Sequence, residues 1–198
     1  MFSNRAAAYL ATLERRQHVA DLRVVREAVV RTGVPRTDAF LEFHAALAGY
    51  IEPAGRDEFV YGIVHPASYW YGALTPQAHE HDGRRYARYA DAHPSYEREI
   101  DEGGAKRAES FVSFIEQHAY VSEFLKSGAA RLELLYVPVS AANDVRSDLH
   151  HARVEEVCDR IASVWATPAW CVLAAESSTW LLWRRPDAPI SLLNEYLA

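Results

Sequence analysis

The sequence predicts an α+β fold: a single domain over residues 1–198 in which helices flank a mostly antiparallel sheet. Three observations support this class. The hydrophobic period changes from helical to strand-like and back along the chain. The predicted strands do not alternate regularly with helices, as a doubly wound parallel sheet would require. The last two predicted strands are joined by a short turn, which makes them an antiparallel hairpin.

The first helical segment spans residues 6–35 and forms one long helix or two in sequence. Leu22, Val25 and Val29 fall at helical spacing, which predicts a buried face on its second half. Pro35 prevents the helix from continuing.

A second helix is expected to begin at Thr37 or Asp38, either of which can cap its N-terminus, and to end at Gly49. Its buried face is expected to hold Phe40, Leu41, His44 and Leu47. A histidine on an apolar face is usually a satisfied, partly buried side chain, and we expect this of His44 and of His118.

Beyond this helix the period becomes that of a strand. Residues 57–66 alternate in the manner of a strand, and residues 68–74 predict a second one. Residues 75–108 contain closely spaced turn signals separated by short polar pieces of helical character. We therefore expect an irregular polar insertion near 75–108.

The second half of the chain begins with an amphipathic helix that follows Ser110 and ends at Gly128. Residues 131–139 predict a strand, and residues 143–165 predict another helix. This last helix is indicated by apolar residues at helical spacing, namely Val154, Val157, Ile161 and Val164.

The C-terminal part predicts the hairpin. Residues 169–176 and 179–186 read as two strands, with a turn at Ser177 and Ser178 between them. A short helix is expected after Pro189.

Composition narrows the classes of function. Hydrophobic residues make up 49% and charged residues 24% of the chain, as in an ordinary soluble globular protein. The net charge of −6 argues against nucleic-acid binding, which usually needs a basic patch, and it permits a basic partner. No apolar run reaches the roughly 18 residues that a membrane span needs. Charged residues follow the apolar start too early for a secretory signal, which favours a cytoplasmic protein.

The two cysteines, Cys158 and Cys171, are too few for a disulfide framework and lack metal-binding spacing. Both lie among apolar neighbours, which predicts free buried thiols. Such thiols suit a reducing compartment.

The densest group of potential metal ligands is the stretch QAHEHDGRRYARYADAHP, residues 77–94. It contains His79, His81, Asp82, Asp91 and His93. Histidines and carboxylates held together could bind a catalytic metal, so a metal-dependent hydrolase using the His79–His93 loop is the alternative hypothesis. A flexible loop does not preorganise ligands, and a solvated polar loop is the simpler interpretation.

Other catalytic patterns are missing from the sequence. No Gly-x-Ser-x-Gly elbow, phosphate-binding loop or dinucleotide-binding glycine motif occurs. We therefore expect no enzyme activity, no cofactor and no metal.

Exposed aromatic and acidic side chains remain as the candidate site. Aromatic rings beside acidic residues make good interface anchors for a basic protein. The residues expected to bind the partner are Asp57, Glu58, Tyr69, Tyr71, Glu97, Glu99, Asp101 and Glu102.

Four segments carry a resemblance to a known family. The run VPRTDAFLEFHAALAGYIEP followed by FVYGIVHP resembles the opening of the SUKH superfamily, and SFIEQHAYVSEFL and WCVLAAESSTWLLWRR are similar to its later helix and terminal hairpin. The likeness covers residues 34–185 loosely. The chain has Ala48-Gly49 where the family usually has a Gly-Gly pair, and it adds the insertion at 75–108.

This resemblance implies a non-enzymatic binding role. Many bacterial members look like immunity proteins that neutralise a toxin, often a nuclease, by direct binding, and others are scaffold proteins. It implies a cognate protein toxin as the partner, and it carries over no catalytic residue.

Overall fold

The computed structural model describes residues 1–15, 17, 19–31, 37–54, 57–61, 78–81, 84–87, 101–102, 105–106, 111–175, 179–188 and 196. The chain divides into two compact units. Unit 1 comprises Met1–Tyr9 and Ala105–Ala198, and unit 2 comprises Leu10–Gly104. Helices and antiparallel sheets build both units, which confirms the α+β class. The expectation of one domain over residues 1–198 stays a prediction.

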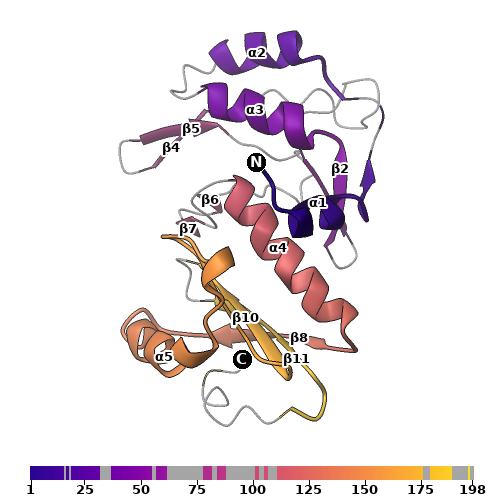
Figure 1. The fold of residues 1–198 in the computed structure, drawn as a ribbon. Helices are drawn as coiled ribbons and strands as arrows, with labels where there is room; N and C mark the ends of the chain where they lie inside the picture. Colours follow the sequence, from indigo (N-terminus) through magenta and orange to yellow (C-terminus); the bar gives the residue numbers. More distant parts are fainter. Residues whose placement is uncertain are drawn as a thin grey trace. The chain divides into compact units, whose positions relative to one another are not determined.

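Unit 1 is built on a four-stranded antiparallel sheet with the strand order β8-β11-β10-β9 (Figure 1). Its strands are β8 (Arg131–Tyr136), β9 (Ser163–Ala166), β10 (Trp170–Ala174) and β11 (Thr179–Arg184), with the short β7 (Ala105–Lys106) ahead of them. Its helices are α1 (Asn4–Leu10, whose last residue falls in unit 2), α4 (Phe111–Lys126) and α5 (Ala142–Asp148), with the single 3-10 turns η2 (His150–Ala152) and η3 (Glu155–Val157). The predicted strand at 131–139 and the predicted C-terminal hairpin are confirmed as β8 and β10–β11.

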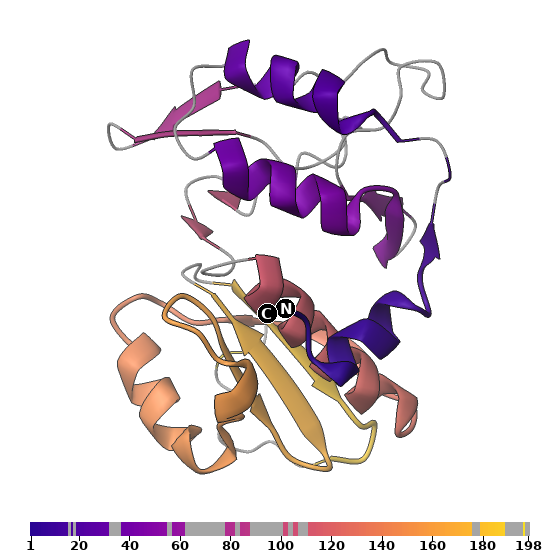
Figure 2. The same cartoon turned by 45° about the horizontal axis from the view of Figure 1, so that its top comes forward.

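Helices cover both faces of this sheet, α4 on one side and α5 on the other (Figure 2). On the α5 side, Trp165 and Trp180 stack with ring centroids 5.6 Å apart, and both are buried. On the α4 side, Val121 and Phe124 pack against Cys171. The resulting core consists of apolar side chains from α4, α5 and every strand of the sheet.

Unit 2 contains the helices α2 (Leu22–Arg31) and α3 (Thr37–Leu47) and the antiparallel strands β1 (Glu14–Arg15), β2 (Tyr50–Ala54) and β3 (Asp57–Val60). It also contains β4 (Ala78–His81), β5 (Arg84–Ala87) and β6 (Asp101–Glu102). Leu41 and Leu47 are buried, as predicted for the α3 face. The side chain of Phe40 lies outside the described part.

His44 of α3 is a buried, hydrogen-bonded residue, as expected. Its Nε2–H donates to the Ala20 carbonyl oxygen over 2.9 Å, and its side chain is 3% exposed. Burial lowers the pKa of His44, because the charged imidazolium loses its hydration.

Two glycines end helices where the sequence predicts it. Gly49, just after α3, has φ = 87°, and Gly128, just after α4, has φ = 152°. Residues other than glycine rarely adopt these backbone angles, so a glycine at each position lets the chain leave the helix.

The helix predicted over residues 143–165 is wrong in its second half. Only α5 is α-helical; the chain continues through η2 and η3 and becomes strand β9. The helix ends at Asp148, and Arg153 is already extended. Further along, Asp159 forms the turn into β9, because its Oδ1 accepts the backbone N–H groups of Ile161 and Ala162 over 2.7 and 2.6 Å. Val154 and Val164 are buried as expected, but on a turn and a strand.

Smaller differences occur elsewhere. The segment 6–35 contains two helices, which the sequence allowed, with β1 between them. Within the expected polar loop at 75–108, β4 and β5 form an antiparallel hairpin. The predicted strand at 57–66 is described as β3 alone, and the predicted strand at 68–74 and the helix after Pro189 lie outside the described residues.

A search of the described helices for one long and apolar enough to cross a bilayer finds none.

Candidate interaction surface

Strand β8 forms one edge of the unit 1 sheet, and the only strand paired with it among the described residues is β11. Its side chains alternate strongly in exposure. Leu132, Leu134 and Tyr136 are 53%, 47% and 56% exposed, whereas Leu135 between them is fully buried. We call these three side chains, together with the backbone edge of β8 that no other described strand pairs, the β8 surface.

The register of the sheet explains this exposure. Leu134 lies opposite Leu181 of β11, and Leu132 lies opposite Trp183. Side chains at directly opposed positions share a face, so the exposed residues of β8 lie on the face that α4 covers. Helix α4 packs against side chains of β9 and β10 and against Trp183 of β11 on that face, whereas Leu132, Leu134 and Tyr136 of β8 are about half exposed. Figures 1 and 2 show α4 on this side of the sheet.

The opposite face of β8 is apolar in its centre and charged near its start. Arg184 of β11 makes a two-pronged ion pair with Glu133, at 2.6 Å from Nη2 to Oε1 and 3.2 Å from Nε to Oε2. The hydrogen bond to Glu133 raises the pKa of Arg184. Glu133 is therefore a paired charge and offers no free carboxylate at the edge.

The turn that leads from α4 into β8 is fixed by Arg185. Its guanidinium donates to the carbonyl oxygens of Phe124 and Ala129 over 3.0 and 2.9 Å and to the hydroxyl of Ser127. It also lies 4.6 Å from the centre of the Phe124 ring. A side chain at Gly128 would place its Cβ 2.9 Å from Arg185 Nη1, so the Arg185 guanidinium would have to shift, and the backbone angle itself favours glycine. These contacts hold β8 in place relative to α4.

The other edge of the sheet, β9, is covered by its own chain. Arg153 forms an antiparallel bridge with Trp165, and the N–H of Val154 donates to the Val164 carbonyl oxygen over 2.9 Å. The Cys158 sulfur accepts the N–H of Val164 over 3.3 Å. The segment 153–158 thus protects the β9 edge.

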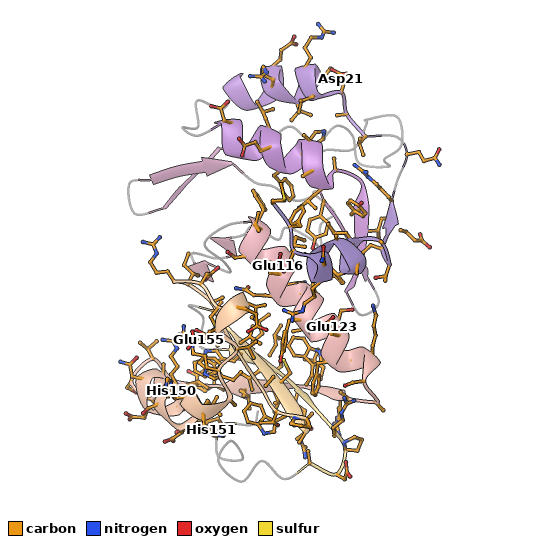
Figure 3. The ribbon with its side chains drawn as sticks, in the orientation of Figure 1. Asp21, Glu116, Glu123, His150, His151 and Glu155 are labelled. Carbon is orange, nitrogen blue, oxygen red and sulfur yellow. The ribbon has the colours of Figure 1, made fainter. Side chains whose placement is uncertain are left out.

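A second polar cluster joins α1 to α4 (Figure 3). The Glu116 carboxylate accepts the N–H and the hydroxyl of Ser3 over 2.7 and 2.6 Å. Arg5 pairs with Glu123 at 2.8 Å and Glu156 at 3.5 Å. The acidic groups therefore have cationic or hydrogen-bonding partners, and the cluster anchors α1 rather than forming an open site.

Tyr120 lies beside this cluster, with the Arg5 guanidinium 5.1 Å from its ring centre. Burial is the main cause that raises the pKa of Tyr120, and Cys171 and Glu156 add to it. The raised pKa keeps the Tyr120 phenol protonated near neutral pH.

The predicted partner-binding residues lie elsewhere. Asp57 and Glu58 begin β3, and Asp101 and Glu102 form β6, but only their backbone is described. Tyr69, Tyr71, Glu97 and Glu99 lie outside the described residues. Whether these side chains meet on one surface stays a prediction.

Two of the predicted metal ligands have a defined backbone. His79 and His81 lie two positions apart on β4, which pairs with β5. Asp82, Asp91 and His93 fall outside the described part of the chain. Groups of three or more His, Cys, Asp or Glu side chains able to hold a metal were sought among the described residues, and none was found there.

The β8 surface itself was missed by sequence reasoning. The segment RLELLYV was predicted as a strand, and its signal was that both faces are apolar, with Leu132, Leu134 and Tyr136 on one and Leu135 and Val137 on the other. A strand that is apolar on both faces usually lies inside a sheet. At an edge, the same pattern leaves one apolar face exposed.

No protein-family model, curated protein or solved structure matches this chain, so the resemblance to the SUKH superfamily stays a prediction.

Proposed function

We propose that this chain is a non-enzymatic, cytoplasmic binding protein that neutralises a cognate bacterial toxin by direct contact through the β8 surface. The observation that carries this proposal is the exposure of Leu132, Leu134 and Tyr136, each about half exposed, on an open sheet edge.

An apolar stripe on an edge strand favours protein binding for two physical reasons. Contiguous exposed apolar side chains lose unfavourable contact with water when a partner covers them. The N–H and C=O groups of an edge that no described strand pairs can also bond an extended segment of the partner, which then adds a strand to the sheet. Val139, 83% exposed just after β8, extends the apolar character beyond the strand.

The toxin class follows from charge and from the SUKH resemblance. A nuclease offers a positive field to its nucleic-acid substrate, and a protein with a net charge of −6 is attracted by that field. In this proposal the acidic residues Asp57 and Glu58 increase the association rate, and the β8 surface slows dissociation by burying apolar groups.

The test is binding to the product of a toxin-like neighbouring gene, measured by calorimetry for wild type and for Leu134→Ser. We expect Leu134→Ser to weaken binding at least tenfold, because it places a polar group at the centre of the stripe. Leu22→Ser is the matched control, since Leu22 is 39% exposed on α2 and lies off the β8 surface. Equal affinities for the two variants, or no binding to any neighbouring product, would contradict the proposal.

The salt dependence of the association rate tests the role of charge. Reversing Asp57 and Glu58 should lower the rate and flatten its dependence on ionic strength. An unchanged, salt-insensitive rate would remove the acidic residues from the proposal and leave the β8 surface in place.

A metal-dependent hydrolase is the second candidate, and one observation favours it. His79 and His81 lie at alternate positions of β4, and alternate residues of a strand point to the same face. A strand orders ligands better than a free loop does. About one zinc per chain in elemental analysis, lost in the His79→Ala and His81→Ala double variant, would support this candidate over the first.

A further inference from the structure

We propose that in the free protein the β8 surface is covered by a second copy of this chain, whose β8 pairs antiparallel with the first about a two-fold axis at Leu134. The two four-stranded sheets would then form one continuous sheet. This inference rests on the proposed function, because it uses the same β8 surface. It states that a second copy of this chain covers that surface when no toxin is bound.

The first argument is the symmetry of the stripe. An axis at Leu134 places the two Leu134 side chains opposite each other and places Leu132 of each copy opposite Tyr136 of the other. The exposed face is therefore apolar at every one of these pairs, and all three residues are about half exposed before pairing. Aliphatic and aromatic side chains at opposed positions are favourable neighbours across antiparallel strands.

The second argument is charge. The charged residues of β8 are Arg131 and Glu133. In the same register Glu133 lies opposite Leu135 and Arg131 opposite Val137, so no two like charges oppose each other. Glu133 is already neutralised by Arg184 at 2.6 Å. Natural edge strands commonly avoid pairing by carrying an exposed charge or a proline. The exposed charge of β8 is Arg131 at its first position, and the three exposed side chains Leu132, Leu134 and Tyr136 are uncharged.

The third argument is closure. A sheet with two open edges could extend without limit, whereas this sheet has its β9 edge covered by Arg153 and Val154. Among the described strands, pairing is therefore open on one side of the sheet, and an interface that uses the same patch on both copies closes after two chains. The predicted assembly is a dimer and not a fibre.

The experiment is the molar mass of the full chain in solution, measured by sedimentation over a range of micromolar concentrations. Wild type should sediment as a dimer, and Leu134→Lys should sediment as a monomer, because it brings two charges together at the axis. Leu22→Lys is the matched control and should remain a dimer. Circular dichroism on both variants checks that each is folded.

A crosslinking measurement tests the register. In a Cys158→Ser background, Leu134→Cys should be joined into covalent dimers by a short bifunctional thiol reagent. Leu132→Cys alone should not be joined, whereas a mixture of Leu132→Cys and Tyr136→Cys chains should be. Wild-type protein that is monomeric throughout, or crosslinking that is equal for all three variants, would overturn the proposal.

The same variants separate this inference from the proposed function. A monomeric wild type whose toxin binding is lost in Leu134→Ser would contradict the dimer and leave the toxin proposal standing. A dimer that binds no neighbouring toxin would do the reverse. If both proposals hold, toxin must displace the second copy, and the apparent affinity for toxin should fall as the concentration of this protein rises.

Discussion

The two edges of the unit 1 sheet are treated differently by the chain. At β9, the segment 153–158 returns along the strand and bonds Val164 and Trp165. At β8, no described strand lies beyond Leu132, Leu134 and Tyr136, and each of these apolar side chains is about half exposed.

The comparison indicates that the chain protects the β9 edge of the sheet and does not protect the β8 edge with any described strand. The chain covers β9 with a short segment and two turns of 3-10 helix, so covering an edge within this fold takes few residues. Leaving β8 open and apolar runs against the usual protection of sheet edges in soluble proteins. This contrast is why we assign binding to β8.

The largest expected effect tests the two faces of β8 against each other. Leu135 is fully buried and Leu134 is 47% exposed, although they are adjacent. Leu135→Ala should lower the free energy of unfolding by roughly 2–5 kcal/mol, because it leaves a cavity in the core. Leu134→Ala should lower it by about 1 kcal/mol or less. Urea denaturation of both variants at one protein concentration provides the measurement, and equal losses would show that the assigned faces are wrong.

The next effect concerns the segment that covers β9. Asp159→Ala removes the acceptor for the N–H groups of Ile161 and Ala162 and for the side-chain amide of Gln117 at 3.4 Å. Leaving such groups unpaired should cost roughly 1–3 kcal/mol of unfolding free energy. Asp159→Asn keeps an oxygen acceptor and should cost less. Hydrogen exchange at the Val164 amide should also become faster in Asp159→Ala; unchanged exchange would mean that the turn does not hold the cover.

A smaller effect is expected in unit 2, where His44 should make the free energy of unfolding depend on pH. Burial lowers the pKa of His44 below its ordinary value of 6.5. The folded protein therefore binds fewer protons than the unfolded chain below that value, so His44 contributes full stability above about pH 6.5 and progressively less as the pH falls toward its folded pKa. The loss should not exceed about 1.4 kcal/mol per pH unit. Urea denaturation at several pH values, with His44→Gln as a variant that cannot titrate, measures it; the same pH slope in both proteins would exclude His44 as the cause.

The smallest expected effect is a difference in thiol reactivity between the segment 153–158, which covers β9, and strand β10. Cys171 is fully buried in β10, and burial raises its pKa to about 12, so it should not react with a maleimide in the folded protein. Cys158 is half-buried in the covering segment and should react faster. Mass spectrometry of briefly labelled protein gives the ratio. Equal labelling of both thiols would mean that the α4 side of the sheet opens as readily as its cover.

Much of the fold could be predicted because its signals are local. Helix α4 ends at a glycine with a positive φ, and β10–β11 is a hairpin between adjacent apolar runs. The segment 143–165 could not be predicted, because its apolar residues fit helical spacing. Its last part is held by the side chain of Asp159 and by a backbone hydrogen bond from Val154 to Val164, and the hydrophobic period does not record such contacts.

The candidate surface was less predictable than the fold. The sequence shows that β8 is apolar on both faces, but the exposure of Leu134 depends on how far α4 extends across the sheet. This is a property of packing between segments, and one strand cannot reveal it. The acidic and aromatic residues chosen from the sequence remain predictions, since their side chains lie outside the described part.

Unit 1 is built from two separate stretches of the sequence, Met1–Tyr9 and Ala105–Ala198, and this affects the order in which it folds during synthesis on the ribosome. Ser3 is made 113 residues before its partner Glu116, and Arg5 is made 118 and 151 residues before its partners Glu123 and Glu156. At about 5–20 residues per second, Arg5 waits roughly 8–30 s for Glu156. A seven-residue helix is marginal alone in water. Helix α1 therefore docks only after α4 has been made.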